Sequence, residues 1–135
     1  MGRSYAELIR RLNYDPEFFR PCPIDSEDQW TKRVATTHDI HHVVAGFGTM
    51  PAGESGVLAI TAAQIGFPTY VLLTTAGQLA SFRFQLQRYE EIAQALAHGM
   101  AIGHQAHCLA AARWEEGWER PISDSADGEA YGLAV

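Results

Sequence analysis

The stretch LQRYEEIAQALAHGMAIGHQAHCLAAARWEEGW, residues 86–118, decides the fold class, because its apolar and small side chains recur at steps of three and four. Such steps place side chains on one face of an α-helix, whereas a half-buried strand alternates every second residue. The sequence therefore predicts one long amphipathic helix from Leu86 to shortly before Pro121, in which Gly99 and Gly103 introduce a bend. The stripe consists of Tyr89, Ala93, Leu96, Met100, Gly103, His107, Ala111, Trp114 and Trp118.

Helix signals continue upstream of this stretch. We expect helices over residues 4–12, from Asp25 or Ser26 to Ala45, over residues 52–65, and after Pro68. The sequence shows neither a period of two nor an internal repeat. We therefore predict an all-α fold, a single-domain helical bundle of about five to six helices over residues 1–135, with a flexible polar tail at 123–135.

The composition limits the function classes. Ten Lys and Arg residues against sixteen Asp and Glu residues give a formal net charge of −6, which argues against a nucleic-acid partner, because phosphate backbones are bound by clustered cations. Cys22 and Cys108 lie far apart in no metal-binding spacing, and two free thiols in a reducing compartment are the simpler interpretation. The first residues lack the apolar core of a secretory signal, so we expect a cytoplasmic location.

The apolar stretch at residues 57–77 raises the question of a membrane span. Gln64, Gly66 and Pro68 interrupt it in the middle. Two buried helices joined at Phe67 and Pro68 explain the stretch better than one helix that crosses a bilayer.

The segment HDIHHVVAGFGTMPAGE, residues 38–54, concentrates groups that bind metals. On a helix each residue advances by about 100°, so His42 falls near 40° from His38 and Asp39 near 100°. These three side chains can face one point, and the glycine-rich connection that follows allows Glu54, in the first turn of the next helix, to face it as well. We predict that His38, Asp39, His42 and Glu54 bind one divalent metal and serve as the catalytic residues. Their imidazole and carboxylate groups favour zinc, with iron, manganese or magnesium as alternatives.

Simpler interpretations stay open for several of these features. The small residues on the same arc, Thr31, Ala35, Ala45 and Gly46, leave room for a metal and a substrate, but they also permit close packing of another helix. A first-turn glutamate such as Glu54 also suits the helix dipole alone. His41 points elsewhere, and we expect it at the surface or as a support for the ligands.

The pattern H-D-x-x-H, followed by eleven residues and E, resembles the signature of the ubiquinone (coenzyme Q) biosynthesis protein Coq-four family. His38, Asp39, His42 and Glu54 fill it here. The resemblance continues in HVVAG, GESGVLAI and IGFP between His42 and Pro68, and in RWEEGWERPI near the end. It covers about residues 28–122, whereas residues 1–25 show no alignment to the family.

The resemblance implies a role in coenzyme Q biosynthesis: metal-dependent oxidative decarboxylation, with hydroxylation of the same carbon, of a polyprenylated 4-hydroxybenzoate-type ring. It also implies a homodimer, a prenylated aromatic or isoprenoid lipid as ligand, and other quinone biosynthesis proteins as partners. The alternative is a non-catalytic protein that binds prenyl lipid or acts as a scaffold, with a structural metal. Apolar helices around Pro68 offer a lipid groove and peripheral attachment at the inner face of a membrane, although most apolar stripes are simply core.

Overall fold

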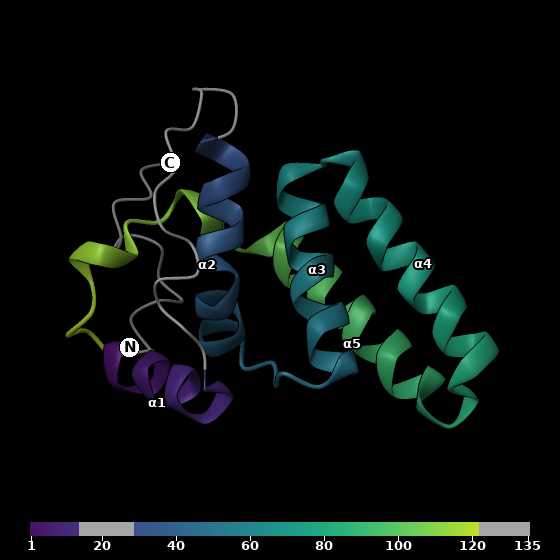
Figure 1. Ribbon diagram of the computed structural model, residues 1–135. Coiled ribbons are helices and arrows are strands. Elements are labelled where there is room, and N and C mark those ends of the chain that lie inside the picture. The colour runs from purple at the N-terminus through teal and green to yellow at the C-terminus, as the bar shows by residue number, and fades with distance from the viewer. Residues whose placement is uncertain (14–28, 122–135) are drawn as a thin grey trace.

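The computed structural model describes residues 1–13 and 29–121. In these ranges the chain forms five α-helices and two short 3-10 helices, and no strand (Figure 1). Their bounds are α1 Gly2–Leu12, α2 Gln29–Ala45, α3 Pro51–Ile65, α4 Pro68–Phe84, α5 Leu86–Gln105, η1 Leu109–Ala111 and η2 Trp114–Glu116. The all-α prediction is confirmed. The expected helix start at Asp25 or Ser26 and the tail at 123–135 lie outside the described residues.

The long C-terminal helix is shorter than predicted. Helix α5 ends at Gln105, and the chain continues in extended backbone at Ala106 and then in η1 and η2. The side-chain amide of Gln64 on α3 binds the backbone that follows α5. Its Nε2 donates to His107 O at 2.8 Å, and its Oε1 accepts from Leu109 N at 2.9 Å. The second half of the stripe therefore includes the buried Trp114 but also the exposed His107, Ala111 and Trp118.

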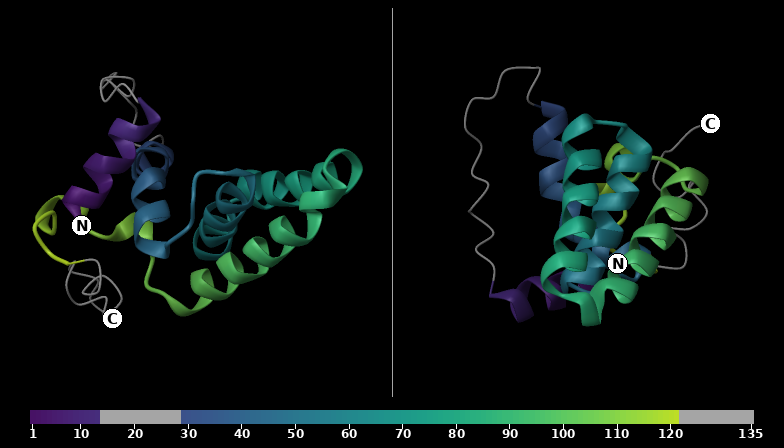
Figure 2. Two further views of the ribbon diagram at one scale, coloured as in Figure 1. Left: turned by 90° about the horizontal axis from the view of Figure 1, so that it is seen from below. Right: turned by 90° about the vertical axis from the view of Figure 1, so that its right-hand side faces the viewer.

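Helices α3 and α5 make the closest contact in the fold, and glycines permit it. A Cβ atom added at Gly99 would lie 2.1 Å from Gly56 O, and one added at Gly103 would lie 2.6 Å from the Cβ of Ala63. The two α5 glycines that were expected to bend the helix thus allow its backbone to approach α3. Figure 2 shows the two helices crossing at close range.

The C-terminal segment returns to the start of the chain. Gly2 N donates to Trp118 O at 2.8 Å, and the rings of Tyr5 and Trp118 lie with their centroids 5.3 Å apart. The core beneath this junction consists of the buried side chains of Met1, Ile40, Ile60, Leu109, Ala112 and Trp114. Helix α2 therefore packs between the two ends of the described chain and α3.

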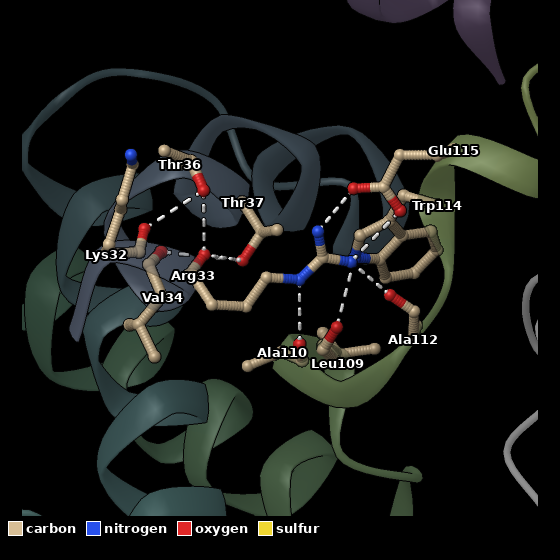
Figure 3. Close-up of polar contacts among 10 residues, drawn as sticks. All are labelled: Lys32, Arg33, Val34, Thr36, Thr37, Leu109, Ala110, Ala112, Trp114 and Glu115. Carbon is tan, nitrogen blue, oxygen red and sulfur yellow. Dashed lines mark hydrogen bonds and ion pairs between the residues drawn. The ribbon is translucent and has the colours of Figure 1, made fainter. Parts of the chain in front are cut away.

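Arg33 on α2 fastens the C-terminal segment to this core (Figure 3). Its guanidinium donates to Ala110 O at 3.2 Å, to Ala112 O, and to both carboxylate oxygens of Glu115. Trp114 Nε1 donates to Leu109 O at 3.0 Å in the same region. One arginine thus replaces the backbone hydrogen bonds that the segment lacks because it is not an α-helix.

Helix α4 was expected to be buried, and it is not. It lies at the outer edge of the molecule against α3 and α5 (Figure 1). Most of its large apolar side chains are exposed, among them Leu72 at 68% and Leu79 at 67%. None of the described helices is both long and apolar enough to cross a membrane.

Candidate metal centre

The C-terminal half of α2 and the first turn of α3 bring three ligand groups together. His38 and His42 lie one turn apart on α2, and Glu54 lies in the first turn of α3. One nitrogen of each imidazole and one carboxylate oxygen all lie within 4.8 Å of one another. The predicted convergence of His38, His42 and Glu54 is therefore present in the fold.

A five-residue connection from Gly46 to Met50 reverses the chain between these helices. Gly46 ends α2 in the left-handed region, at φ 72°, where a residue without a Cβ has no strain. Pro51 starts α3, and Glu54 N donates to Met50 O at 3.0 Å. A Cβ at Gly53 would lie 1.7 Å from Gly48 O, so only glycine allows the connection to pack against the start of α3.

The ligand atoms already have the spacing of a coordination shell. Glu54 lies between the two rings: its Oε2 is 3.1 Å from His38 Nε2, and its Oε1 is 3.3 Å from His42 Nε2. The two Nε2 atoms are 3.3 Å apart. With metal bonds of about 2.0–2.1 Å, tetrahedral ligands lie about 3.3 Å apart and ligands at right angles about 2.9 Å. A cation therefore fits among these atoms with little movement.

The hydrogen bonds that His42 makes through Nδ1 leave its Nε2 as an acceptor. Its Nδ1 faces two carbonyl oxygens, Gly48 O at 3.1 Å and Phe47 O at 3.4 Å, so in the neutral ring Nδ1 carries the proton. The lone pair of Nε2 then points at the Glu54 carboxylate, and two acceptors cannot bond without a cation or proton between them. Metal-binding histidines typically have this arrangement, in which the ring nitrogen that does not bind the metal donates to a backbone carbonyl.

The centre lies at the boundary between core and solvent. The side chain of His42 is 1% exposed, that of His38 27% and that of Glu54 43%. A closed structural zinc site has four protein ligands, whereas three converge here among the residues that the structure describes, with one accessible side. Asp39, the fourth predicted ligand, is half-buried and does not belong to the set of groups that converge.

Comparisons with known proteins identify the family. A family model for the coenzyme Q (ubiquinone) biosynthesis protein Coq4 matches residues 1–127. The chain belongs to the Coq4 family. The match begins at Met1, so it includes the first 25 residues, for which the sequence alone offers no resemblance. The description of this family names coenzyme Q (ubiquinone) biosynthesis.

A solved structure supports this assignment. The crystal structure of a candidate ubiquinone biosynthesis protein from Nostoc punctiforme superposes with a TM-score of 0.80 at 26% sequence identity. The alignment covers 98% of this chain and 62% of the Nostoc chain, so this Coq4-family chain spans less than two thirds of that protein's length. No curated protein gives a significant match.

His41 occupies a position that the sequence did not predict for this Coq4-family chain. It is buried, with 1% exposure, rather than at the surface. Neither ring nitrogen has a hydrogen-bond partner among the described residues. Burial lowers the pKa of His41 to about 3, and the nearby His38 and His42 act in the same direction, while the Leu109 backbone acts against them. The ring is therefore neutral and lies beside the converging set of His38, His42 and Glu54 without joining it.

A cavity of about 350 Å³ lies on the other side of His42, between α1 and the Gly46–Met50 connection. Its lining includes the charged side chains of Glu7 and Arg11 and the ring of Phe47. This volume is at the lower end of small-molecule sites. In this Coq4-family chain α1 therefore supplies polar groups near the centre. They could not be predicted from the sequence, because they depend on how α1 packs against α2.

The remaining candidates take structural roles or stay apart from the centre. Arg33 and Arg113 pair with Glu115 and Glu116 respectively. Among the described residues, His104 and His107 belong to no converging metal-binding set and are exposed. Ala35 and Gly46 are exposed, so they do not enclose the centre as the small-residue arc suggested. Cys22 lies outside the described residues, so the thiol prediction stays a prediction.

Proposed function

We propose that this chain is a metal-dependent enzyme that decarboxylates a polyprenylated 4-hydroxybenzoate-type ring and hydroxylates the same carbon. The observation that carries the proposal is the set of two histidines and one carboxylate with an accessible side. Sets of two histidines and one carboxylate with open positions are typical of non-haem iron(II) oxygenases. This favours iron over the zinc that donor types alone suggest.

The overall reaction defines what the site has to accomplish. An aromatic acid, dioxygen and two reducing equivalents give a phenol, carbon dioxide and water. Loss of carbon dioxide without oxidation would leave an electron pair in a ring orbital that cannot delocalise it. When oxygen is first added at that carbon, loss of carbon dioxide restores aromaticity instead. A bound divalent metal would supply Lewis acidity and, if it is iron or manganese, redox chemistry.

The protein's own groups would prepare this step. His38, His42 and Glu54 would hold the cation, and the hydrogen bonds from His42 to the Gly48 and Phe47 carbonyls would fix the ring in its binding orientation. Asp39 lies next to His38 in sequence but outside the converging set. We propose that it acts on the substrate or as a base rather than on the metal. The cavity beside His42 would admit an aromatic ring, whereas an isoprenoid tail requires further apolar surface.

The alternative is a non-catalytic prenyl-lipid-binding or scaffold protein with a structural metal. A carboxylate that is 43% exposed, and a set of three ligands rather than four within residues 1–13 and 29–121, argue against it, because structural sites are closed. Homodimer formation and contacts with other quinone biosynthesis proteins are compatible with either function.

The test combines metal analysis with turnover of a short-chain prenyl 4-hydroxybenzoate under oxygen and a reductant. His38→Ala and Glu54→Gln are expected to lower bound metal and to reduce product formation by roughly a hundredfold or more, since each removes a ligand. His104→Ala, which changes an exposed histidine outside the set, is the control.

Two results would contradict the enzyme proposal. One is unchanged metal content and turnover in both ligand variants. The other is wild-type protein that binds metal in full and releases no carbon dioxide, which would support the structural-metal alternative.

A further inference from the structure

Helix α4 has its polar side inward and its apolar side outward. The side chains that face α3 and α5 at steps of three and four are Tyr70, Thr74, Gln78 and Ser81, of which Thr74 and Ser81 are buried. The outer face, which we define as Val71, Leu72, Leu73, Leu79, Phe82 and Phe84, is between 48% and 76% exposed. This is the reverse of a helix that covers a core in water, and exposed apolar patches of this kind mark interaction sites.

The hydroxyl groups show how α4 tolerates this orientation. Thr74 Oγ1 donates to Val71 O at 2.8 Å and Ser81 Oγ to Gln78 O at 2.7 Å, so both buried hydroxyls bond within their own helix. They require no polar partner on α3 or α5, and small side chains at these positions let α4 approach its neighbours. The large apolar side chains remain on the opposite side.

Charge narrows the choice of partner for the outer face. Between Glu54 and Glu90 the sequence contains no acidic residue, although the chain has sixteen. The charged side chains in that interval are Arg83 and Arg88, at the corner where α4 meets α5. This corner, residues 84–88, is a surface hollow of about 560 Å³ with Phe84, Leu86 and Arg88 in its lining. The Arg83 guanidinium lies 5.2 Å from the centroid of the Phe84 ring.

We infer that the outer face of α4 and the 84–88 corner dock on the surface of a bilayer that contains anionic lipid. The apolar side chains would enter the boundary between headgroups and acyl chains, and the two arginines would bind lipid phosphates. A second copy of the chain is the competing occupant, because the exposed Glu90 and Glu91 near the start of α5 lie next to Arg88 and would offer partners to the arginines of another copy; the light-scattering test below separates the two occupants. The inference does not depend on the metal chemistry, since it rests on a different surface.

The location of α4 supports this assignment. Figures 1 and 2 show α4 at the outer edge of the molecule, on the side opposite α1. If α4 docks on the bilayer, α1 would lie on the side of the molecule away from the lipid. Helix α2 and the set of His38, His42 and Glu54 would lie between α1 and the membrane surface. A prenylated ligand dissolved in the same bilayer would then be within reach of the protein without a membrane-spanning helix.

Vesicle co-sedimentation tests the inference. The wild-type chain is expected to bind vesicles of phosphatidylcholine and phosphatidylglycerol in equal parts more tightly than vesicles of phosphatidylcholine alone. Leu72→Gln/Leu79→Gln is expected to weaken binding roughly tenfold or more, because two apolar side chains no longer favour the lipid. The matched control is Leu12→Gln/Met50→Gln, which changes two exposed apolar residues away from α4 and is expected to bind as the wild type does.

Charge reversal separates the contribution of the corner. Arg83→Glu/Arg88→Glu is expected to abolish the preference for anionic vesicles, whereas Arg3→Glu/Arg10→Glu, with the same change in net charge, is expected to retain it. Because these substitutions are on exposed positions, circular dichroism should show unchanged helix content. His38→Ala should bind vesicles normally, which distinguishes failure of this inference from failure of the proposed function.

A fluorescence measurement tests the same inference with single substitutions. Phe84→Trp is expected to be quenched by brominated lipid more strongly than Leu12→Trp. The inference is overturned if the wild type does not bind anionic vesicles or if the α4 variants bind as well as the wild type does. It is equally overturned if light scattering shows that the α4 variants convert a stable dimer to a monomer while vesicle binding is unchanged, because the face would then be a subunit interface.

Discussion

His42 links the converging set of His38, His42 and Glu54 to the backbone, and this is the residue on which the local geometry depends most. Its Nε2 lies 3.3 Å from His38 Nε2 and 3.3 Å from Glu54 Oε1, and its Nδ1 donates to Gly48 O at 3.1 Å. The same carbonyl lies where a side chain at Gly53 would be. The orientation of one imidazole therefore depends on a connection that requires glycine at Gly46 and Gly53.

At the same scale, the Arg33–Glu115 pair predicts a pH dependence of stability. Hydrogen bonds from Arg33 lower the pKa of Glu115 below its ordinary value of 4.5. A carboxyl group whose folded-state pKa is depressed stabilises the fold above its unfolded-state pKa, and the contribution is lost as the pH falls through the folded-state pKa. Glu115→Gln is expected to lower the free energy of unfolding by about 0.5 kcal/mol at neutral pH, a small value because the carboxylate is largely exposed.

Urea unfolding at neutral pH and at about pH 3 measures this contribution. The difference between the wild type and Glu115→Gln should be smaller at the lower pH, because protonation removes the charge of the carboxylate. Glu116→Gln, which removes the exposed pair with Arg113 at 3.4 Å, is the control and should change little at either pH. A difference of equal size at both pH values would show that the Glu115 side chain acts through packing rather than through its charge.

Single residues also show what the sequence could predict at the centre. His38 and His42 were predictable because four residues on a helix return to within about 40°, and Glu54 because a glycine-rich connection starts a new helix three residues before it. Asp39 lies about 100° from His38, which is too far around the helix to join a set whose atoms are 3.1–3.3 Å apart. The burial of His41 was not predictable, since it depends on the C-terminal segment that covers α2.

At the scale of elements, the contact between α3 and α5 determines how closely the bundle packs. Gly99→Ala would place a Cβ 2.1 Å from the Gly56 carbonyl oxygen, and backbone cannot move aside as a flexible side chain can. We expect this change to reduce the free energy of unfolding by about 2 kcal/mol or more. Gly77→Ala on α4 is the matched control, because nothing lies within 4 Å of the added atom.

Gly77→Ala and Gly99→Ala should change the stability of the fold in opposite directions. Removing a glycine from an exposed helix interior stabilises the helix by about 1 kcal/mol, so Gly77→Ala should raise the midpoint of urea unfolding while Gly99→Ala lowers it. Equal effects of the two substitutions would contradict the view that the α5 glycines serve packing rather than bending.

The elements also explain where sequence periodicity failed. The stripe at residues 86–118 predicted α5 correctly as far as Gln105. Its later positions, such as Trp114, are buried by η1 and η2 with hydrogen bonds from Gln64 and Arg33 instead of by a continued helix. These partners are distant in sequence, so periodicity alone could not reveal them. In the same way, the apolar sequence of α4 predicted burial and not an outward-facing surface.

At the scale of the whole molecule, the fold separates two surfaces with different chemistry. The set of His38, His42 and Glu54 lies where α2 meets α3, and the exposed apolar face lies on α4 at the outer edge of the molecule (Figure 1). With the proposed function and the inferred docking of α4, this division would allow contact with a bilayer on one side and polar chemistry on the other. The fold class was predictable from helical periodicity, but the separation of the two surfaces required the tertiary structure.

The central claim is that His38, His42 and Glu54 bind one divalent cation. X-ray absorption spectroscopy of the zinc-loaded protein measures this most directly. We predict nitrogen and oxygen ligands at about 2.0–2.1 Å, with the scattering of two imidazole rings in the wild type and of one in His38→Ala. A spectrum without imidazole scattering, or one that His38→Ala leaves unchanged, would contradict the claim.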